Sequence, residues 1–376
     1  MWHFYPDNYM WSYQVIRMCS QTYYGGGEVN EILDVAGRIE VGNYNSFHKE
    51  WMILGDRTLA KAYEALDLNR VETARAAFLR AANYLRTAEF FLQPNDERKL
   101  PTYLKSIQAF RKGASMLENQ PEIVEIPFEH ACLTGYFYKA PNVSNGPLMI
   151  MFGGLDSTSE ELYYGPAQLL NERGISLLAV DGPGQGGSLR LHNVHSRYDF
   201  DVAGTAAYEW AVANLDIDEN KVGVMAVSMG GYMAARCAAF EPRFKLCAIW
   251  GAVYDYYETW ANRPDNHPLG NIVQHILNVE SMQAAREKLK NYTLQGVAEK
   301  ITVPTYIIHG ADDRQNVVEN AYRTYNDLKG PRWLKIVAAS DPGSAHCQVD
   351  NITETFEMYD WIKEQFQHVQ VEQLNM

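Results

Sequence analysis

The stretch KVGVMAVSMGG, residues 221–231, decides the fold of this 376-residue chain. Its first seven residues form an apolar run typical of a buried strand, and the following YMAARCAA is typical of a helix rich in small residues. A serine at such a junction is typical of a nucleophile elbow, a strained turn that exposes the hydroxyl group at the start of the helix. Ala226 stands where the pattern usually has its first glycine, a position that needs only a small side chain. We therefore expect Ser228 to be a nucleophile. The alternative, a structural serine in a tight turn, would show the same sequence pattern.

Apolar runs of the same character recur along the second part of the chain, and amphipathic segments with helical spacing separate most of them. The runs are LMIMF (148–152), ISLLAV (175–180), LCAIW (246–250), TYIIH (305–309) and WLKIVAA (333–339). Two shorter strands, 122–129 and 133–140, are expected around a turn at Glu129 and His130. Near-continuous apolar strands that alternate with helices are typical of a mostly parallel sheet with helices on both faces, so we predict an α/β fold.

Two other regions differ from this alternating pattern. Residues 256–300 are too long for a single crossover between strands, so they are predicted to carry a helical lid insertion. The first 120 residues show helical spacing and no strand pattern, with VETARAAFLRAANYLRTAEFF (71–91) as the clearest helix. We predict two domains, a helical domain over residues 1–120 and an α/β domain over residues 121–376 that contains the lid.

Composition narrows the class of protein. Hydrophobic residues make up 47% of the chain and charged residues 21%, which excludes intrinsic disorder as a description of the whole chain. The formal net charge of -13 argues against a nucleic-acid or anionic-membrane binder. There is no apolar run of about 18 residues that could span a membrane, and the N-terminus lacks the pattern of a signal peptide. Five scattered cysteines fit free thiols in a reducing compartment, so we expect a cytoplasmic protein.

A serine nucleophile needs an acid and a base, and on this fold the acid precedes the base in the chain. The apolar run 305–309 ends in His309 and leads into a loop that carries Asp312 and Asp313. Asp313 has the commoner spacing for the acid, Asp312 is its close rival, and either one could instead cap the helix that follows. Asp255 and Glu258, after the run LCAIW, are further carboxylates that could orient the base.

The base is expected in the loop after the last strand. Of the ten histidines, only His346 and His368 follow the acid, and His368 lies in the polar tail. His346 stands in a loop rich in glycine and proline, before a final helix predicted over 353–366. The pair His346 and Cys347 lacks the ligand spacing of a zinc site, so we predict no metal. His309 is interpreted as a buried residue at the end of a strand.

Two glycine-rich loops complete the pattern. GGLDS (153–157) follows a strand at the place where hydrolases of this architecture put an oxyanion donor, so the backbone amides of Leu155 and Met229 are predicted to bind a developing oxyanion. DGPGQGG (181–187) matches a dinucleotide-binding loop only loosely and lacks its acidic partner. There is no Walker A sequence, so this second loop is interpreted as a structural turn beneath the site, and no cofactor is predicted.

These motifs together resemble the α/β-hydrolases. More narrowly, the chain is similar to a group that includes 2,6-dihydroxypseudooxynicotine hydrolase, the fungal yellowish-green pigment hydrolases and FrsA-like esterases. The resemblance covers nearly the whole chain and is carried by TARAAFLRAANYLRTAEFF (73–91), GGLDS, DGPGQG, VSMGGY (227–232) and the late His-Cys pair. The helical front segment and the GGLDS loop are its more specific parts. It implies an α/β-hydrolase fold with Ser228 as nucleophile, Asp313 as acid and His346 as base.

The resemblance also implies an activity. Members of this group cleave a carbon–carbon bond next to a ketone, in a retro-Claisen step, in aromatic or polyketide-like substrates. The same triad would also suit a carboxylesterase, thioesterase or peptidase, and a cyclase or acyltransferase of a biosynthetic pathway would reuse the same pocket. The chain is rich in aromatic residues, with 24 Tyr and 8 Trp. Aromatic residues are concentrated in two stretches, 2–24 and 250–260. We expect these aromatic residues to flank a pocket for a flat substrate, or to pack in a core or a dimer interface. The resemblance implies that the front segment helps to cover the active site and to form a homodimer.

Overall fold

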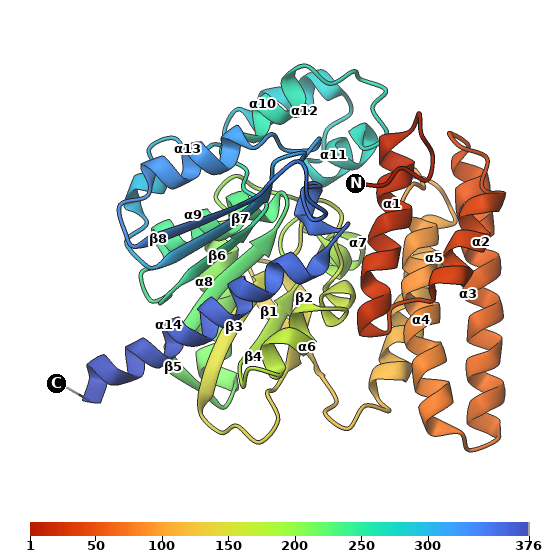
Figure 1. Cartoon of the computed structure of the whole chain (residues 1–376), viewed down its shortest axis with the longest axis horizontal. Helices are drawn as coiled ribbons and strands as arrows, with labels where there is room; N and C mark the ends of the chain where they lie inside the picture. Colours follow the sequence, from red (N-terminus) through yellow and green to blue (C-terminus); the bar gives the residue numbers. More distant parts are fainter. Residues whose placement is uncertain (375–376) are drawn as a thin grey trace. The chain divides into compact units, whose positions relative to one another are not determined.

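A computed structural model describes residues 1–374, with side chains up to residue 368 (Figure 1). Contacts divide the chain into two compact units. One unit is Trp2–Pro121, and the other comprises Met1 and the chain from Glu122 onward. Among residues 1–374, no helix combines the length and the apolar composition that are needed to cross a bilayer.

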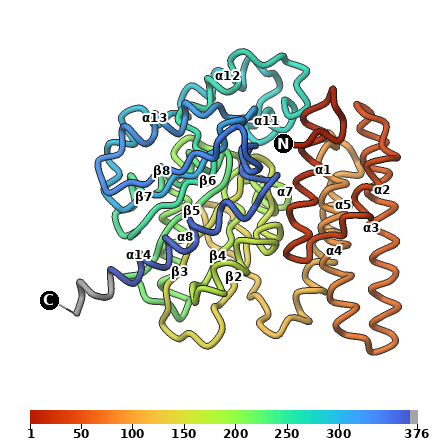
Figure 2. The backbone as a smooth tube through the Cα atoms, in the orientation of Figure 1, coloured from red at the N-terminus to blue at the C-terminus, as the bar shows by residue number. Residues whose placement is uncertain are grey.

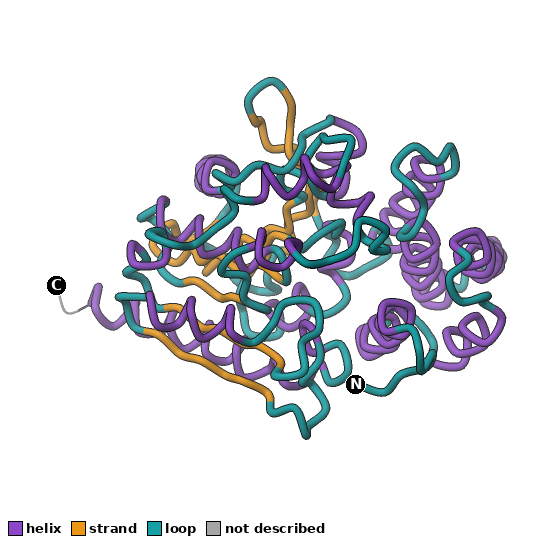
Figure 3. Tube along the Cα trace, turned by 90° about the horizontal axis from the view of Figure 1, so that it is seen from above, coloured by secondary structure: helices purple, strands orange, loops and turns teal. Residues whose placement is uncertain are grey.

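The first unit is built from helices. They are α1 (Tyr9–Ser20), a 3₁₀ turn (Gln21–Tyr24), α2 (Val29–Arg38), α3 (Tyr44–Asp67), α4 (Val71–Glu89) and α5 (Lys99–Ala114). Figure 3, which colours helices purple and strands orange, shows strands only in the other unit. The Asn43 side chain caps the start of α3 by accepting from the amides of Asn45 and Ser46. Helices α3 and α4 pack closely at Gly55, where an added Cβ would lie 2.8 Å from the Leu85 side chain.

Aromatic side chains form part of the core of the helical unit. Trp11 is almost fully buried. Its ring stacks against Phe91 at 5.2 Å and Tyr44 at 6.0 Å, and meets Phe47 edge-on at 5.2 Å. Trp2 and Tyr23, in contrast, are 65% and 69% exposed. The aromatic residues at the N-terminus therefore include both core and surface residues.

The second unit is organised around an eight-stranded sheet with the order β1-β2-β4-β3-β5-β6-β7-β8. Strands β1 and β2 pair antiparallel, as do β2 and β4, and all other neighbours are parallel. The strands are β1 (Glu122–Phe128), β2 (Ala131–Tyr138), β3 (Gly146–Phe152), β4 (Ser176–Val180), β5 (Ile217–Val227), β6 (Cys247–Trp250), β7 (Thr305–Gly310) and β8 (Arg332–Val337). The predicted α/β architecture with a mostly parallel sheet is confirmed.

Helices cover both faces of this sheet. On one face α8 and α9 pack together against β5, and on the other α6 and α14 lie side by side, with α14 crossing in front of the sheet (Figure 1). The helices that alternate with the strands are α6 (Pro166–Asn171), α7 (Gly186–His192), α8 (Asp201–Asn214), α9 (Gly230–Phe240), α13 (Glu319–Asp327) and α14 (Phe356–Leu374). Short 3₁₀ turns lie at Ser159–Tyr163, His346–Gln348 and Ile352–Thr355. The final helix begins three residues later than the sequence predicts, because the 3₁₀ turn Ile352–Thr355 occupies its expected first turn.

The segment between β6 and β7 forms a helical insertion, which Figure 2 traces through α11 and α12. It contains α10 (Tyr256–Ala261), α11 (Gly270–Ile276), α12 (Met282–Leu289) and a 3₁₀ turn (Ala298–Lys300). Tyr254, Tyr256 and Trp260, in the aromatic-rich stretch of this region, are buried. Burial of these rings fits a packing role, one of the two roles expected for them.

Candidate active site

Ser228 lies at the tip of a strained turn between β5 and α9. Its φ angle is +63°, a left-handed conformation that residues other than glycine seldom adopt. The turn is held at its base because the Ser228 amide donates to the carbonyl of Trp250 at the end of β6 (2.8 Å). Strain of this kind at a functional residue persists only where the surrounding structure enforces it.

Small residues around Ser228 are a steric requirement of this turn. A Cβ added at Gly230 would lie 2.6 Å from the Gly153 carbonyl oxygen and 2.7 Å from the Ala226 Cβ, and one at Gly231 would lie 2.3 Å from the Gly251 carbonyl oxygen. Ala226, two residues before Ser228, is fully buried. The geometry explains why alanine suffices at position 226 while the two positions after Met229 need glycine.

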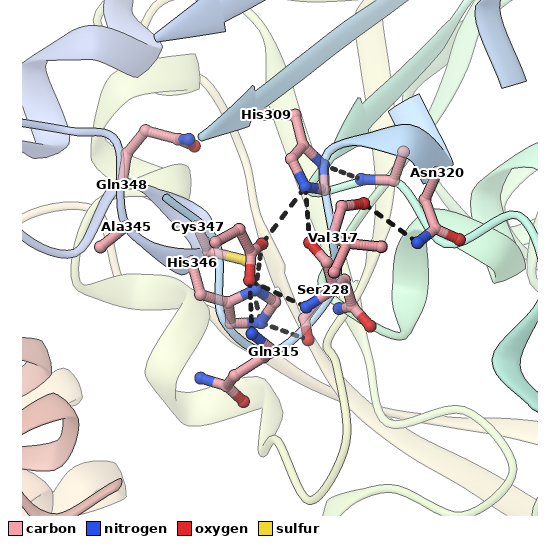
Figure 4. A network of polar contacts seen from close by, with 12 residues as sticks. Ser228, His309, Gln315, Val317, Asn320, Ala345, His346, Cys347 and Gln348 are labelled. Carbon is pink, nitrogen blue, oxygen red and sulfur yellow. Dashed lines mark hydrogen bonds and ion pairs between the residues drawn. The ribbon is translucent and has the colours of Figure 1, made fainter. Parts of the chain in front are cut away.

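His346 lies next to Ser228 (Figure 4), and its other ring nitrogen contacts Asp313. It begins the 3₁₀ turn after β8, and its side chain is buried. His346 Nε2 lies 2.8 Å from Ser228 Oγ, and His346 Nδ1 lies 2.6 Å from Asp313 Oδ2. Because a carboxylate only accepts, Nδ1 carries the hydrogen and Nε2 is free to accept the serine proton. The structure thus brings the predicted nucleophile, base and acid into one hydrogen-bonded chain, the arrangement of a serine triad.

Asp313 is oriented by the backbone of its own loop. Its Oδ1 accepts from the amides of Gln315 and Asn316, each at 2.8 Å, which leaves Oδ2 for His346. Burial would raise the pKa of Asp313, but His346 and these hydrogen bonds hold it below its usual value. Burial also lowers the pKa of His346, but the Asp313 carboxylate and Cys347, whose Sγ lies 3.5 Å from His346 Nε2, together outweigh burial, so the pKa of His346 is raised above 6.5. The site therefore stabilises an imidazolium beside a carboxylate.

The other predicted carboxylates lie elsewhere. Asp312 faces Arg314, with 3.6 Å between carboxylate oxygen and guanidinium nitrogen. Asp255 caps α10 by accepting from the Glu258 amide (3.1 Å), and Glu258 pairs with Arg323 at 2.5 Å. The carboxylate that contacts His346 is that of Asp313, and these three are engaged by other groups.

The predicted oxyanion donors flank the serine. Gly154 packs directly on the elbow, since an added Cβ would lie 2.9 Å from the Ser228 Cβ, and Leu155 is the next residue. Met229 follows the serine at the start of α9. Within residues 1–374 neither the Leu155 nor the Met229 amide donates a hydrogen bond to another protein group. An oxyanion hole is built from amides that donate to no other group, so both residues remain candidates for it.

The DGPGQGG loop holds the GGLDS loop (153–157), for which oxyanion binding was predicted, and sequence reasoning did not define this role. The buried Gln185 donates from Nε2 to the carbonyls of Gly153 (2.8 Å) and Gly154 (3.1 Å), while its Oε1 accepts from the Gly182 amide (3.0 Å). Its neighbour in the loop, Asp181, accepts from the backbone amide of Ser159 at 2.7 Å. The available signal in the sequence was a glutamine between glycines. Its hydrogen-bond partners are about 30 residues away, and only the fold brings them together.

One cluster in the described part of the chain offers three potential metal ligands, Glu125, Cys132 and His192. Their ligand atoms lie within 4.8 Å of one another, with His192 Nε2 at 3.3 Å from Cys132 Sγ. Strands β4 and β3 separate this hairpin edge from β5 and Ser228.

Comparison with known proteins places the chain in a family. The sequence model of the prolyl oligopeptidase family matches residues 163–369, a range that contains Ser228, Asp313 and His346. The chain belongs to this family of α/β-hydrolases. It is therefore an enzyme of the hydrolase class, and the predicted α/β-hydrolase fold is confirmed.

Several fungal hydrolases are similar in sequence. The hydrolase acrC of Aspergillus aculeatus is 34% identical over 364 residues, which cover 83% of this chain and 84% of that one. The 20-hydroxy-prefusarin hydrolase FUS2 of Gibberella moniliformis is 34% identical over 67% of this chain and 62% of its own. The hydrolyase poxO of Penicillium oxalicum is 32% identical over 66% of this chain and 61% of its own. The matched region thus spans less than two thirds of the last two proteins.

Two solved structures share the fold over nearly the whole chain. The 2,6-dihydroxy-pseudo-oxynicotine hydrolase superposes with a TM-score of 0.80 at 24% identity, covering 93% of this chain and 95% of that one. AbyA5 superposes with a TM-score of 0.67 at 15% identity, covering 92% and 94%. The resemblance expected from the sequence is confirmed at the level of family and fold.

Proposed function

We propose that this enzyme hydrolyses a carbon–carbon bond next to a ketone in an aromatic or polyketide-like substrate, using Ser228, His346 and Asp313 as a catalytic triad. The observation that carries the triad is the 2.8 Å contact between Ser228 Oγ and His346 Nε2 at a serine held with φ +63°. A hydroxyl group becomes a nucleophile when an oriented base takes its proton, and this contact provides the base.

In the first step Ser228 Oγ attacks the ketone carbon while His346 Nε2 takes the hydroxyl proton. The carbonyl π electrons move to oxygen, and the amides of Leu155 and Met229 stabilise the resulting oxyanion. Asp313 stabilises the imidazolium that forms, consistent with the raised pKa of His346. Loss of one oxyanion donor commonly lowers the rate on the order of 10²–10³-fold.

In the second step the oxyanion collapses and the carbon–carbon bond breaks. The bonding electrons go to the departing carbon, where an adjacent carbonyl group stabilises them as an enolate or an aromatic ring delocalises them. His346 Nε2, or a group on the insertion, returns the proton to that carbon. The acyl group is left as an ester on Ser228, and a water deprotonated by His346 releases it as a carboxylic acid. One water is consumed and no redox partner is required.

The support for carbon–carbon cleavage comes from the specific parts of the sequence. The chain resembles carbon–carbon bond hydrolases through its front helix 73–91 and its GGLDS loop, and generic hydrolases lack the front segment. FUS2, whose name makes 20-hydroxy-prefusarin its substrate, is a 34% identical relative. We propose a small aromatic or ketone-containing molecule as the ligand, with neither nucleic acid nor a membrane as partner.

A second candidate is hydrolysis of an ester, thioester or peptide bond. It is favoured by the family match, because the family is described by a peptidase activity. Ester hydrolysis uses the same attack on a carbonyl, and only the leaving group differs, an alkoxide in place of a carbanion. The test must therefore distinguish leaving groups rather than nucleophiles.

The experiment compares wild type with Ser228→Ala on two substrate classes, p-nitrophenyl esters and aryl β-diketones. Carbon–carbon hydrolysis predicts a carboxylic acid and a methyl ketone from the diketone, and mass spectrometry should detect an acyl adduct on wild type that the variant lacks. Turnover of esters alone would contradict the first candidate and support the second. A product with the mass of the substrate would instead indicate a cyclase, and a product in which the acyl group is joined to an acceptor other than water would indicate an acyltransferase.

A further inference from the structure

His309 is a buried histidine outside the triad, and both nitrogens of its ring are engaged (Figure 4). Its Nδ1 accepts from the backbone amide of Ala252 at 3.0 Å. Its Nε2 lies 2.8 Å from the carbonyl oxygen of Asn316. Because a backbone amide only donates and a carbonyl only accepts, Nδ1 is bare and Nε2 carries the hydrogen. The fold thus selects one neutral tautomer of this ring.

The same Nε2–H faces the acid of the triad. It lies 3.4 Å from Asp313 Oδ2, the oxygen that accepts from His346 Nδ1 at 2.6 Å. Asn316, the acceptor of the His309 hydrogen bond, also donates its own amide to Asp313 Oδ1 at 2.8 Å. The histidine therefore ties down the short loop 313–316 whose amides orient the carboxylate. Asp313 Oδ2 is placed between two imidazole rings.

The other side of the ring connects to the nucleophile. Ala252 lies two residues after β6, in a segment whose Gly251 amide donates to the Ile308 carbonyl at 2.9 Å. Trp250, at the start of that segment, accepts the amide of Ser228 at 2.8 Å. His309 therefore spans the distance between the strand that holds the serine turn and the loop that holds the acid.

Burial, rather than the charges around it, favours a neutral His309 ring. Three titratable groups act on it, namely Asp313 in the next loop, His346 after β8 and Glu319 at the start of α13. Burial lowers the pKa of His309 below its usual value, against the opposing effect of Asp313. A second proton would have to go on Nδ1, which already accepts from Ala252. The ring can hold the acid without competing for a proton.

We propose that His309 is a positioning residue of the triad, which in its Nε2–H tautomer holds the Asp313 carboxylate against His346 by tying the acid loop to the end of β6. The inference rests on the proposed roles of Ser228, His346 and Asp313. It adds a residue that touches neither the nucleophile nor a substrate and acts only through the acid.

Two substitutions separate the two hydrogen bonds of the ring. In His309→Asn the side-chain oxygen can stand near the place of Nδ1 and keep the Ala252 contact, whereas the bond to Asn316 is lost. In His309→Gln the longer amide reaches the place of Nε2 and keeps the donor to Asn316. The assay is the second-order rate constant with which a fluorophosphonate labels Ser228, because this rate reports the triad without a known substrate.

The proposal predicts slower labelling of His309→Asn and recovery of most of the rate in His309→Gln. A displacement of about 1 Å can lower a rate on the order of 10²-fold, so we expect a loss of about ten- to a hundredfold in the Asn variant. The acid limb of the pH profile should also move to lower pH in that variant, because a displaced carboxylate stabilises the His346 imidazolium less.

The control variant is His48→Asn. His48 is another buried histidine, it lies in the helical unit, and its Nδ1 is 3.0 Å from the backbone carbonyl oxygen of Ala88. This substitution should lower the melting temperature without slowing the labelling of Ser228. Labelling of His309→Asn at the wild-type rate, or equal slowing in the Asn and Gln variants, would overturn the positioning role while the triad stands. Wild type that labels no better than Ser228→Ala would instead refute the proposed function itself.

A measurement on the wild type keeps the proposal testable if the variants do not fold. Nitrogen-15 spectra of histidine-labelled protein should show His309 with a bare Nδ1 and a protonated Nε2 across the pH range of activity. A protonated Nδ1 on His309 would contradict the proposal, because the ring could then accept no hydrogen bond from Ala252.

Discussion

Replacement of Asp313 by asparagine is the sharpest perturbation of the proposed triad. The change preserves shape, but an asparagine amide can accept on only one side. Asp313 Oδ1 receives two backbone amides, from Gln315 and Asn316, and these donors are fixed. The asparagine oxygen must therefore take the place of Oδ1, and its NH₂ group must face His346 Nδ1. That nitrogen then becomes an acceptor, and the hydrogen of the neutral ring moves to Nε2.

The magnitude follows from this inversion of the tautomer. A protonated Nε2 cannot take the proton of Ser228 Oγ, although the 2.8 Å contact between the two atoms persists. In chymotrypsin-type enzymes the equivalent change lowers kcat about 10⁴-fold, because the histidine is held in the wrong tautomer. At about 1.36 kcal/mol for each factor of ten, this corresponds to a rise of about 5.4 kcal/mol in the barrier. We expect a loss of this size here.

The assay measures fluorophosphonate labelling and p-nitrophenyl ester hydrolysis for Asp313→Asn beside Asp312→Asn. Asp312 is the matched control, because it is the adjacent carboxylate and its nearest cation is Arg314 rather than His346. The control should retain the wild-type rate, and both variants should keep the wild-type melting profile. A loss of less than tenfold in Asp313→Asn, or an equal loss in Asp312→Asn, would show that the acid has been assigned to the wrong residue.

Further predictions concern pH, packing and assembly. The labelling rate should rise with pH along a limb centred above pH 6.5, because His346 must be neutral to accept a proton and Asp313 raises its pKa; a limb below pH 6.5 would contradict this. Gly230→Ala should lower the free energy of unfolding by about 1–3 kcal/mol, as overpacking does, because its Cβ would lie 2.6 Å from the Gly153 carbonyl oxygen. A denaturant titration measures this loss. Gly37→Ala is the control and should cause no such loss, because its Cβ would have nothing within 4 Å. Gln185→Leu should lower stability by a few kcal/mol and slow labelling, since each buried carbonyl left without its donor costs about 1–3 kcal/mol; an unchanged labelling rate would remove Gln185 from the support of the oxyanion loop. We also propose a homodimer, which light scattering should detect as a particle of twice 42.8 kDa; a 42.8 kDa particle would refute it.

Local signals were enough for the architecture of the second unit. Apolar runs in the sequence predicted the buried strands, and β3 to β8 lie where these runs occur. The predicted turn at Glu129 and His130 separates β1 from β2. Ser228 was recognisable because its turn requires small neighbours at fixed spacing. Those requirements act over a few residues, which is the range that a single sequence reveals.

Contacts between distant segments decided the rest. The sequence left Asp312 and Asp313 as rivals and kept Asp255 and Glu258 as alternatives, because all four lie in loops next to the expected site. Only the three-dimensional structure shows that Asp313 Oδ2 reaches His346, 33 residues further along the chain. The same holds for Gln185, whose partners Gly153 and Gly154 belong to another loop.

The sequence alone therefore determined the α/β class, the elbow serine and the histidine after the last strand, because each depends on local periodicity or on order along the chain. The tertiary structure decided which carboxylate meets His346, which glutamine holds the oxyanion loop and which tautomer His309 adopts. These are hydrogen bonds of about 3 Å between separate loops, and their geometry exists only when parallel strands bring the loop ends to one edge of the sheet.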